Sequence, residues 1–113
     1  MEAQPQEIRR YIRSDGSIPF AEWFLSLRDR RVRAKINERL RRVSLGNLGD
    51  YRSVGDGIFE LRIDYGSGYR IYFARVKLTT ILLLCGRDKS TQKQDIRKAK
   101  EYWRDYENRQ STH

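Results

Sequence analysis

The stretch "IFELRIDYGSGYRIYFARV", residues 58–76, decides the fold of this chain. In its first half apolar side chains alternate with polar ones, which is the two-residue period of a β-strand with one apolar face. The sequence GSG at 66–68 is typical of a tight turn, and the alternation resumes after it. The stretch therefore predicts an antiparallel hairpin. The side chains expected on its apolar face are Phe59, Leu61, Ile63, Tyr65, Tyr69, Ile71 and Phe73.

Two more strands are predicted around this hairpin. Residues 79–85, "TTILLLC", are apolar without alternation, as in a central strand that is covered on both faces. We expect this strand to complete a three-stranded antiparallel meander and to end at Gly86. Residues 7–13, "EIRRYIR", alternate imperfectly before the turn signal SDGS and predict an edge strand at the N-terminus.

Helical periodicity replaces strand periodicity between the edge strand and the meander. Pro19 suits the first turn of a helix, and apolar residues follow it at helical spacing. Two sets of apolar residues have helical spacing, but the second set does not continue the phase of the first. We therefore expect a break near residues 28–30 and a basic helical hairpin that ends at Gly46. Residues 46–57 are predicted to be a connection. The two sets are Phe20, Trp23, Phe24 and Leu27, and then Val32, Ile36, Leu40 and Val43.

A last helix is predicted after the meander. Thr91 and Gln94 resemble a capping box at its start, and residues 107–113 are expected to be a disordered tail that includes the single histidine, His113. Its apolar stripe is Ile96, Ala99, Tyr102, Trp103 and Tyr106. The elements together predict an α+β fold in one domain that spans residues 1–113.

The charge of the chain points to an anionic partner. Lys and Arg number 24 against 15 Asp and Glu, which gives a net charge of +9. More than half of this excess lies between Glu22 and Ser44. Such a surface attracts polyanions or an acidic protein, although a merely soluble basic protein would have the same composition. A single cysteine, Cys85, and the lack of a signal or membrane-spanning run predict a cytoplasmic protein with no metal site and no cofactor.

Charged residues gather on the face of the predicted hairpin opposite its apolar face. Arg62 and Arg70 lie there with Glu60 and Asp64, and the following loop carries Arg87 and Lys89. Guanidinium groups fixed on strands are stiff donors for phosphate, and this favours a cleft for a nucleic-acid backbone. The alternative is that these arginines only pair with Glu60 and Asp64 across the strands.

Other residues are candidates for contacts with RNA. Tyr72 is in phase with Arg70 and is the better candidate for stacking on a base, whereas Tyr65 and Tyr69 are in phase with the core and are expected to pack. Arg39 and Arg42 of the basic helical hairpin add positive charge for binding RNA.

The order of elements, together with "FELR", "GYRIYF" and "GRDKSTQ", resembles the RelE/ParE toxin superfamily over residues 6–106. Within it, the chain is most similar to the HigB-like, phage Gp49-like addiction module killer proteins. The resemblance implies a RelE-like fold and a toxin of a type II toxin–antitoxin system. It also implies a metal-independent endoribonuclease that cuts messenger RNA, usually on the ribosome, and a cognate helix-turn-helix antitoxin as its partner.

The same resemblance implies roles for individual residues. By position, Arg62 and Arg70 match the basic strand residues of the family, and Arg87 or Lys89 matches the basic residue after the last strand. We expect Arg70 to stabilise charge on the phosphate and Arg62 to orient the RNA backbone. Glu60 by its chemistry and Lys93 by its position are candidates for the base, but the acid and base remain unassigned.

Two other functions stay open. A toxin similar to ParE would poison DNA gyrase through protein contacts, although such toxins usually lack the basic set of residues found here. A basic module that binds RNA or the ribosome without cutting it would depend mainly on the helical hairpin.

Overall fold

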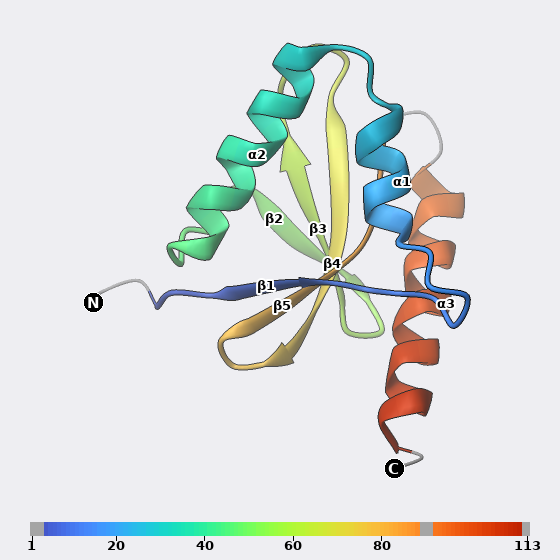
Figure 1. Cartoon of the computed structure of the whole chain (residues 1–113). Coiled ribbons are helices and arrows are strands. Elements are labelled where there is room, and N and C mark those ends of the chain that lie inside the picture. The colour runs from blue at the N-terminus through green and yellow to red at the C-terminus, as the bar shows by residue number, and fades with distance from the viewer. Residues whose placement is uncertain (1–3, 89–91, 112–113) are drawn as a thin grey trace.

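A five-stranded mixed sheet with three helices forms the protein, which confirms the predicted α+β class (Figure 1). The computed structural model describes residues 4–88 and 92–111. No helix within these residues is long and apolar enough to cross a membrane. In chain order the elements are β1 (Glu7–Arg10), α1 (Pro19–Ser26), α2 (Arg30–Ser44), β2 (Tyr51–Gly55), β3 (Ile58–Ile63), β4 (Tyr69–Lys77), β5 (Thr80–Asp88) and α3 (Gln92–Ser111).

The strands follow the order β1-β5-β4-β3-β2 across the sheet. β2, β3, β4 and β5 are antiparallel neighbours, whereas β1 lies parallel to β5 at one edge, where the N-terminal edge strand was predicted. The β3–β4 pair runs from Ile58 opposite Ala74 to Ile63 opposite Tyr69, which is the hairpin expected around residues 66–68. β5 is buried from Thr80 to Gly86 between two neighbouring strands, as expected for a central strand.

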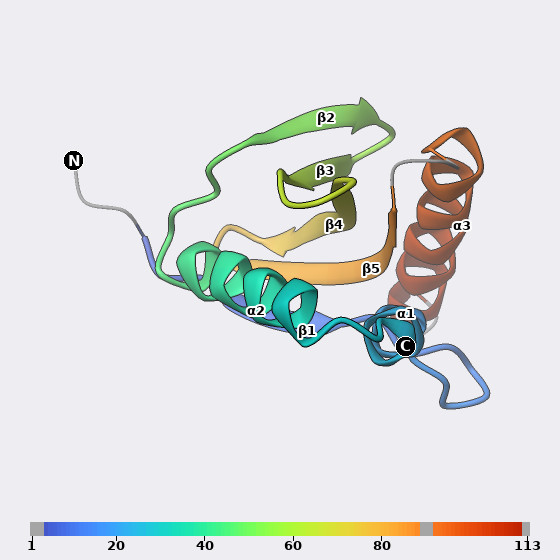
Figure 2. The same ribbon diagram turned by 90° about the horizontal axis from the view of Figure 1, so that it is seen from above.

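Each face of the sheet carries its own apolar core. α1 and α2 cover one face and α3 covers the other (Figure 2). The first core contains the alternating apolar residues of the β3–β4 hairpin, as predicted. The second core was not predicted: α3 packs over Ile58, Tyr72 and Ala74, so part of the face expected to be charged is buried.

The antiparallel meander has four strands, one more than was predicted. β2 lies within residues 46–57, which were expected to be a connection, so that prediction is wrong. The turn from β2 to β3 is made by Gly55, Asp56 and Gly57, all with positive φ. Asp-Gly is a strong signal for such a hairpin turn. The alternating residues 58–63 therefore form the second strand of a β2–β3 hairpin as well as the first strand of the β3–β4 hairpin.

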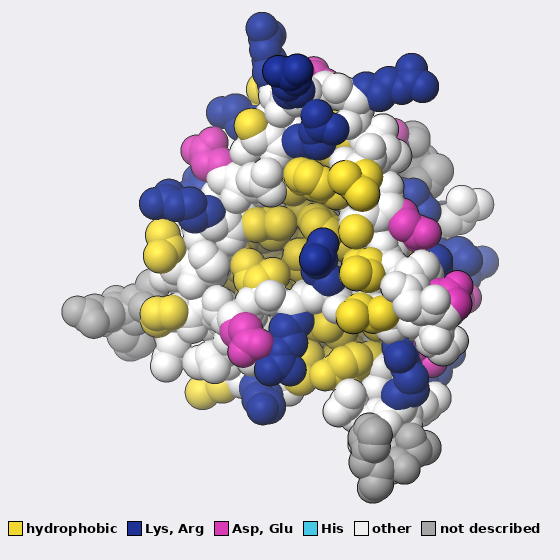
Figure 3. Space-filling model, in the orientation of Figure 1, with side chains coloured by type: hydrophobic (Ala, Val, Ile, Leu, Met, Phe, Trp, Pro, Cys, Tyr) yellow, Lys and Arg dark blue, Asp and Glu magenta, His cyan; other side chains and the backbone are white. Residues whose placement is uncertain are grey.

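The two N-terminal helices begin and end close to the predicted places. Pro19 occupies the first turn of α1, and the predicted break separates it from α2, where the Asp29 side chain caps the helix by accepting a hydrogen bond from the Arg31 amide at 2.8 Å. α1 and α2 diverge as a V over the sheet (Figure 1). Apolar surface remains visible between them, with Lys and Arg side chains around it (Figure 3).

Three predicted boundaries are wrong. The N-terminal strand ends at Arg10 and does not reach residue 13. β5 does not end at Gly86 but continues to Asp88, which places Arg87 on the strand. α3 extends to Ser111, so residues 107–111 are helical and are no disordered tail. Thr91 of the expected capping box and His113 lie outside the described residues.

Gly86 is required by packing. A Cβ atom built on Gly86 would overlap the indole of Trp23, which α1 places against β5 at this point. We expect Gly86→Ala to lower the free energy of unfolding by roughly 2 kcal/mol, because extra volume in a packed core forces neighbouring groups to move. Urea unfolding measures this loss. In a Trp23→Leu background the same substitution should cost less, and an equal cost in both backgrounds would show that the indole is not the cause.

Candidate functional site: a row of arginines on one sheet face

Three arginines lie side by side on adjacent strands. Arg62 of β3 pairs with Arg70 of β4, and Arg70 in turn pairs with Arg87 of β5. Residues that are paired in antiparallel strands point to the same face of a sheet. We call Arg62, Arg70 and Arg87 the arginine row. The sheet therefore brings together three of the four residues predicted to be catalytic, and the fourth, Lys89, lies outside the described residues.

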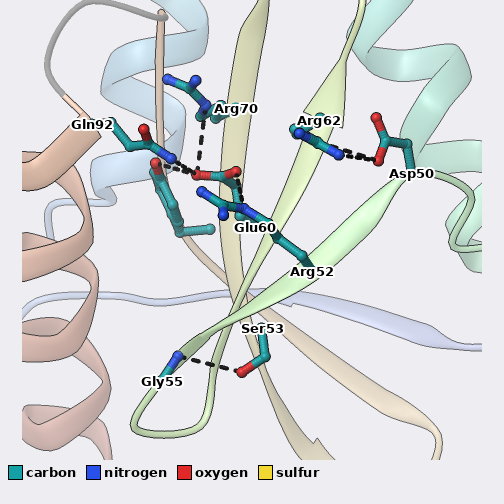
Figure 4. Close-up of polar contacts among 9 residues, drawn as sticks. Asp50, Arg52, Ser53, Gly55, Glu60, Arg62, Arg70 and Gln92 are labelled. Carbon is teal, nitrogen blue, oxygen red and sulfur yellow. Dashed lines mark hydrogen bonds and ion pairs between the residues drawn. The ribbon is translucent and has the colours of Figure 1, made fainter.

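A buried carboxylate holds the middle of this site. The Glu60 side chain is 0% exposed, and its Oε2 lies 3.5 Å from Nε of Arg70. Its Oε1 accepts a hydrogen bond from Nε of Arg52 at 3.0 Å. The Tyr72 hydroxyl and the Gln92 amide each donate to Oε2 at 2.9 Å (Figure 4). Four side chains from three elements, β2, β4 and α3, thus converge on one carboxyl group.

The pKa values of this cluster favour an ionised Glu60. Burial alone would raise the pKa of the carboxyl, but hydrogen bonds from Gln92, Arg52 and Tyr72 outweigh it and hold the pKa below its ordinary value. Burial and the hydrogen bond to Glu60 raise the pKa of the Tyr72 hydroxyl. Glu60 is therefore a fixed negative charge beside Arg70, and Tyr72 is a hydrogen-bond donor.

The other two members of the arginine row also contact carboxylates. Arg62 points toward Asp50 and donates to it from Nε at 3.2 Å and from a terminal nitrogen at 2.9 Å (Figure 4). Arg87 donates from Nε to Asp95 of α3 at 3.2 Å. The Arg62–Asp50 pair has both side chains about half exposed, so its net contribution to stability is at most about 1 kcal/mol. A phosphate can compete for such an arginine.

The predicted alternative, in which the arginines pair with Glu60 and Asp64, is present in part. Arg70 does face Glu60, but the carboxylate that holds Arg62 is Asp50. Including Arg52, the cluster has four guanidinium groups and three carboxylates, so one positive charge remains in excess. Pairing fixes the geometry of the arginines without cancelling the positive charge of the cluster.

Arg39, which was predicted to contact RNA, is mostly buried, and its side chain lines one of the cavities beside Arg62. It is 6% exposed and donates to the carbonyl oxygens of Leu48 at 2.6 Å and Asp50 at 3.1 Å. Gly49 lies against its guanidinium so closely that a Cβ there would approach the group to 2.8 Å. Arg39 therefore shapes the loop at 48–50 that presents Asp50 to Arg62.

Two cavities of similar size open beside the arginine row. One, of about 340 Å³, contains Arg62 and Arg70 together with the β3–β4 turn. The other, of about 320 Å³, contains Arg62 and extends to Arg42 and Lys35 of α2. Because Arg62 lines both, the two cavities are neighbours, and together they form a hollow that extends from α2 to the row with Arg62 between its two parts. Arg42 is exposed along this hollow, which is compatible with its predicted contact with RNA.

The remaining predicted residues differ in how far they are exposed. Tyr72 is 0% exposed in the second core, so it offers no ring face for stacking on a base and that prediction is wrong for this structure. Lys93 is exposed on α3. Tyr65 and Tyr69 pack against the first core, as predicted.

Sequence reasoning missed four residues of the site: Arg52, Gln92, Asp50 and Asp95. Arg52 was missed because β2 was assigned to a connection, and the Asp-Gly turn was the signal that could have found it. The contacts of Asp50 and Asp95 join segments that the hairpin pattern does not relate, and no periodicity in the sequence indicates them.

Comparison with known proteins identifies relatives. A sequence model of the family described as "phage derived protein Gp49-like" matches residues 22–104. An uncharacterized protein of Haemophilus influenzae is 51% identical over 84 residues, which are 74% of this chain and 85% of that protein. The segment matched by the family model contains the second half of α1, the whole of α2, the arginine row and its carboxylate partners.

Proposed function

Because the chain belongs to the Gp49-like family, which is of the RelE/HigB-like toxin type, we propose that it is the toxin of a type II toxin–antitoxin pair. We propose further that it is an endoribonuclease that cuts messenger RNA, with the translating ribosome as the place of action. The observation that carries the second step is the arginine row, in which three adjacent strands present guanidinium groups on one face.

The reaction that suits this site is attack of an RNA 2′-hydroxyl on its own adjacent phosphate. The bond between the phosphorus and the 5′-oxygen breaks, and the products are a 2′,3′-cyclic phosphate and a free 5′-hydroxyl. The phosphate gains negative charge as it becomes pentavalent, and prearranged cations lower the energy of that state. Arg70 is the central member of the row, and we assign to it the stabilisation of the phosphate.

Arg62 and Arg87 flank Arg70 and would bind the RNA backbone on either side. Both are about half exposed. Arg62 exchanges its contact with the exposed Asp50 for a phosphate contact at modest cost. Arg87 keeps its Nε contact with the buried Asp95 and offers its terminal nitrogens to the phosphate. Glu60 is fully buried and accepts hydrogen bonds on both oxygens, so its role here is to position Arg70 and not to act as the general base. The groups that move the two protons are not assigned.

The partner that we propose for the free toxin is an antitoxin with an acidic segment. The net charge of +9 favours such a partner, and the apolar surface between α1 and α2 is surrounded by Lys and Arg side chains (Figure 3). An acidic amphipathic segment would pair its charges with this rim and its apolar side chains with the surface between the helices.

The experiment that tests this proposal maps RNA ends after the chain is induced in bacteria. We expect new 5′-hydroxyl ends in messenger RNA together with arrest of growth, and neither effect with Arg70→Ala. The matched control is Arg10→Ala, which removes an exposed arginine of β1 that lies opposite Leu83, away from the row, and should keep full activity.

Two outcomes would contradict ribonuclease action. DNA breaks linked to gyrase, without new RNA ends, would indicate a toxin similar to ParE. Growth arrest without breaks in either nucleic acid would indicate a module that binds RNA or the ribosome. A purified-component reaction with and without ribosomes then tests where the cleavage takes place.

A further inference from the structure

A third cavity, larger than the two beside Arg62, lies at the end of the sheet where β4 begins and β5 ends. It measures about 550 Å³ and lies between the last turn of α1, the β3–β4 turn and the first turns of α3. Cavities that bind small ligands commonly measure about 300–1,000 Å³. The lining residues used below are Trp23, Tyr69, Arg87, Asp88, Gln94 and Lys98.

One wall of this cavity is aromatic. Tyr69 is half-buried, and its ring centroid lies 6.5 Å from that of Trp23 at an interplanar angle of 53°. Trp23 is 7% exposed and is packed against the backbone of Gly86, so it supports the tyrosine ring from a fixed position. The sequence pattern predicted only that Tyr69 packs in the core. In the structure Tyr69 packs against the first core and also lines the cavity.

The rest of the lining is polar and mixed in charge. Gln94 and Lys98 are exposed on α3, and Asp88 is exposed at the end of β5. An amide offers both donors and an acceptor, a carboxylate accepts and a lysine donates. This set matches the edge of a nucleobase, which presents donors and acceptors side by side and which proteins read when the base is unpaired.

Arg87 joins the cavity to the arginine row, since it is a member of the row and also lines the cavity. Tyr69 and Asp88 form the next pair of the register, so they point to the opposite face of the sheet from Arg70 and Arg87. At the end of the strands, Tyr69 and Arg87 nevertheless line the same cavity. A nucleotide carries its phosphate and its base on one ribose. A phosphate at Arg87 would therefore have its own or the neighbouring base within reach of Tyr69.

We infer that this cavity is a subsite for one unpaired nucleobase of the RNA that binds along the arginine row, with Tyr69 as the stacking surface and Gln94 as a group that contacts the base edge. The inference rests on the proposed function, which supplies the RNA. It adds a place where the protein reads base identity, whereas the row contacts only the backbone.

Binding of mononucleotides tests this subsite without any cleavage. The full chain is titrated with adenosine, guanosine, cytidine and uridine 5′-monophosphates, and with ribose 5-phosphate as the probe that lacks a base. Two-dimensional NMR follows the indole signal of Trp23, which a Trp103→Phe variant distinguishes from the other tryptophan. We expect at least one nucleotide to bind about fivefold or more tightly than ribose 5-phosphate, since stacking on an aromatic ring stabilises a bound base.

The variants separate the base from the phosphate. Tyr69→Leu should lower nucleotide binding to the level of ribose 5-phosphate, whereas Tyr69→Phe should keep the preference. Gln94→Ala, which changes an exposed side chain and leaves the fold intact, should alter the ranking of the four bases. Arg87→Ala should weaken ribose 5-phosphate and the nucleotides alike, because both carry the phosphate.

The inference is overturned if ribose 5-phosphate binds as tightly as every nucleotide, or if Tyr69→Leu and Gln94→Ala both leave the nucleotide preference unchanged. Cleavage assays report on the proposed function separately. Wild-type chain that binds nucleotides by their bases but cuts no RNA would leave the subsite standing and remove the nuclease. RNA cleavage by a chain that shows no preference for nucleotides over ribose 5-phosphate would support the nuclease and overturn the subsite.

Discussion

Replacing Glu60 by glutamine is expected to lower the free energy of unfolding by about 3 kcal/mol, because it removes the charge that Arg52 and Arg70 face in a buried position. The glutamine amide would also turn a donor toward groups that already donate, the Tyr72 hydroxyl and the Gln92 amide. This loss of unfolding free energy is at the low end of the range for a broken buried ion pair, because the Arg52 side chain is half exposed and water can solvate it. Urea unfolding of the two chains measures it.

The matched control is Glu101→Gln, an exposed position on α3, which should change stability by less than about 0.5 kcal/mol. A Glu60→Gln variant as stable as this control would show that the buried carboxylate contributes nothing to the fold.

The same pair of chains has a defined dependence on pH. The pKa of Glu60 is held below its ordinary value in the folded state, so its contribution is complete above the unfolded pKa of about 4.3 and is lost as pH falls through the lower folded pKa. The stability difference between wild type and Glu60→Gln should therefore be constant near neutral pH and shrink in strongly acidic buffer. A difference that grows on acidification would contradict an ionised Glu60.

The positions of Arg62 and Arg70 in the arginine row could be predicted from the sequence, because apolar and polar residues alternate along the two strands of one hairpin. A hairpin with a short glycine turn fixes which residues are opposite each other, so Arg62 and Arg70 had to share a face once the turn was recognised. Arg87 joined them only because β5 continues past Gly86. A glycine usually marks the end of a strand, but here its missing side chain makes room for Trp23.

The carboxylates of the site did not follow from the sequence because their positions depend on tertiary packing. Asp50 reaches Arg62 through a loop that Arg39 holds from α2, and Asp95 reaches Arg87 only when α3 docks on the sheet. The docking of α3 also buried Glu60 and Tyr72, which in an isolated hairpin would face solvent. Alternation predicts which face a residue is on, but it does not predict what covers that face.

Replacing Arg70 by lysine is expected to reduce RNA cleavage by about 100-fold or more, close to the loss with alanine, even though the charge is kept. Arg70 has a side chain that is 14% exposed and directs Nε toward Glu60 at 3.5 Å. A guanidinium distributes five donors over three nitrogens, so it can contact a carboxylate and a phosphate at the same time. A lysine has a single nitrogen, and Glu60 would compete with the phosphate for it.

The same substitution at Arg87 provides the contrast. Arg87→Lys should lose only about tenfold or less, since Arg87 is half exposed and its proposed contact with the RNA backbone depends mainly on charge. Single-turnover cleavage at saturating enzyme compares the two variants, and circular dichroism shows that both remain folded. If Arg70→Lys cuts at a rate within threefold of wild type, the reaction does not depend on a guanidinium that contacts Glu60 and the phosphate at the same time. The assignment of Arg70 to the phosphate would then lose its structural basis.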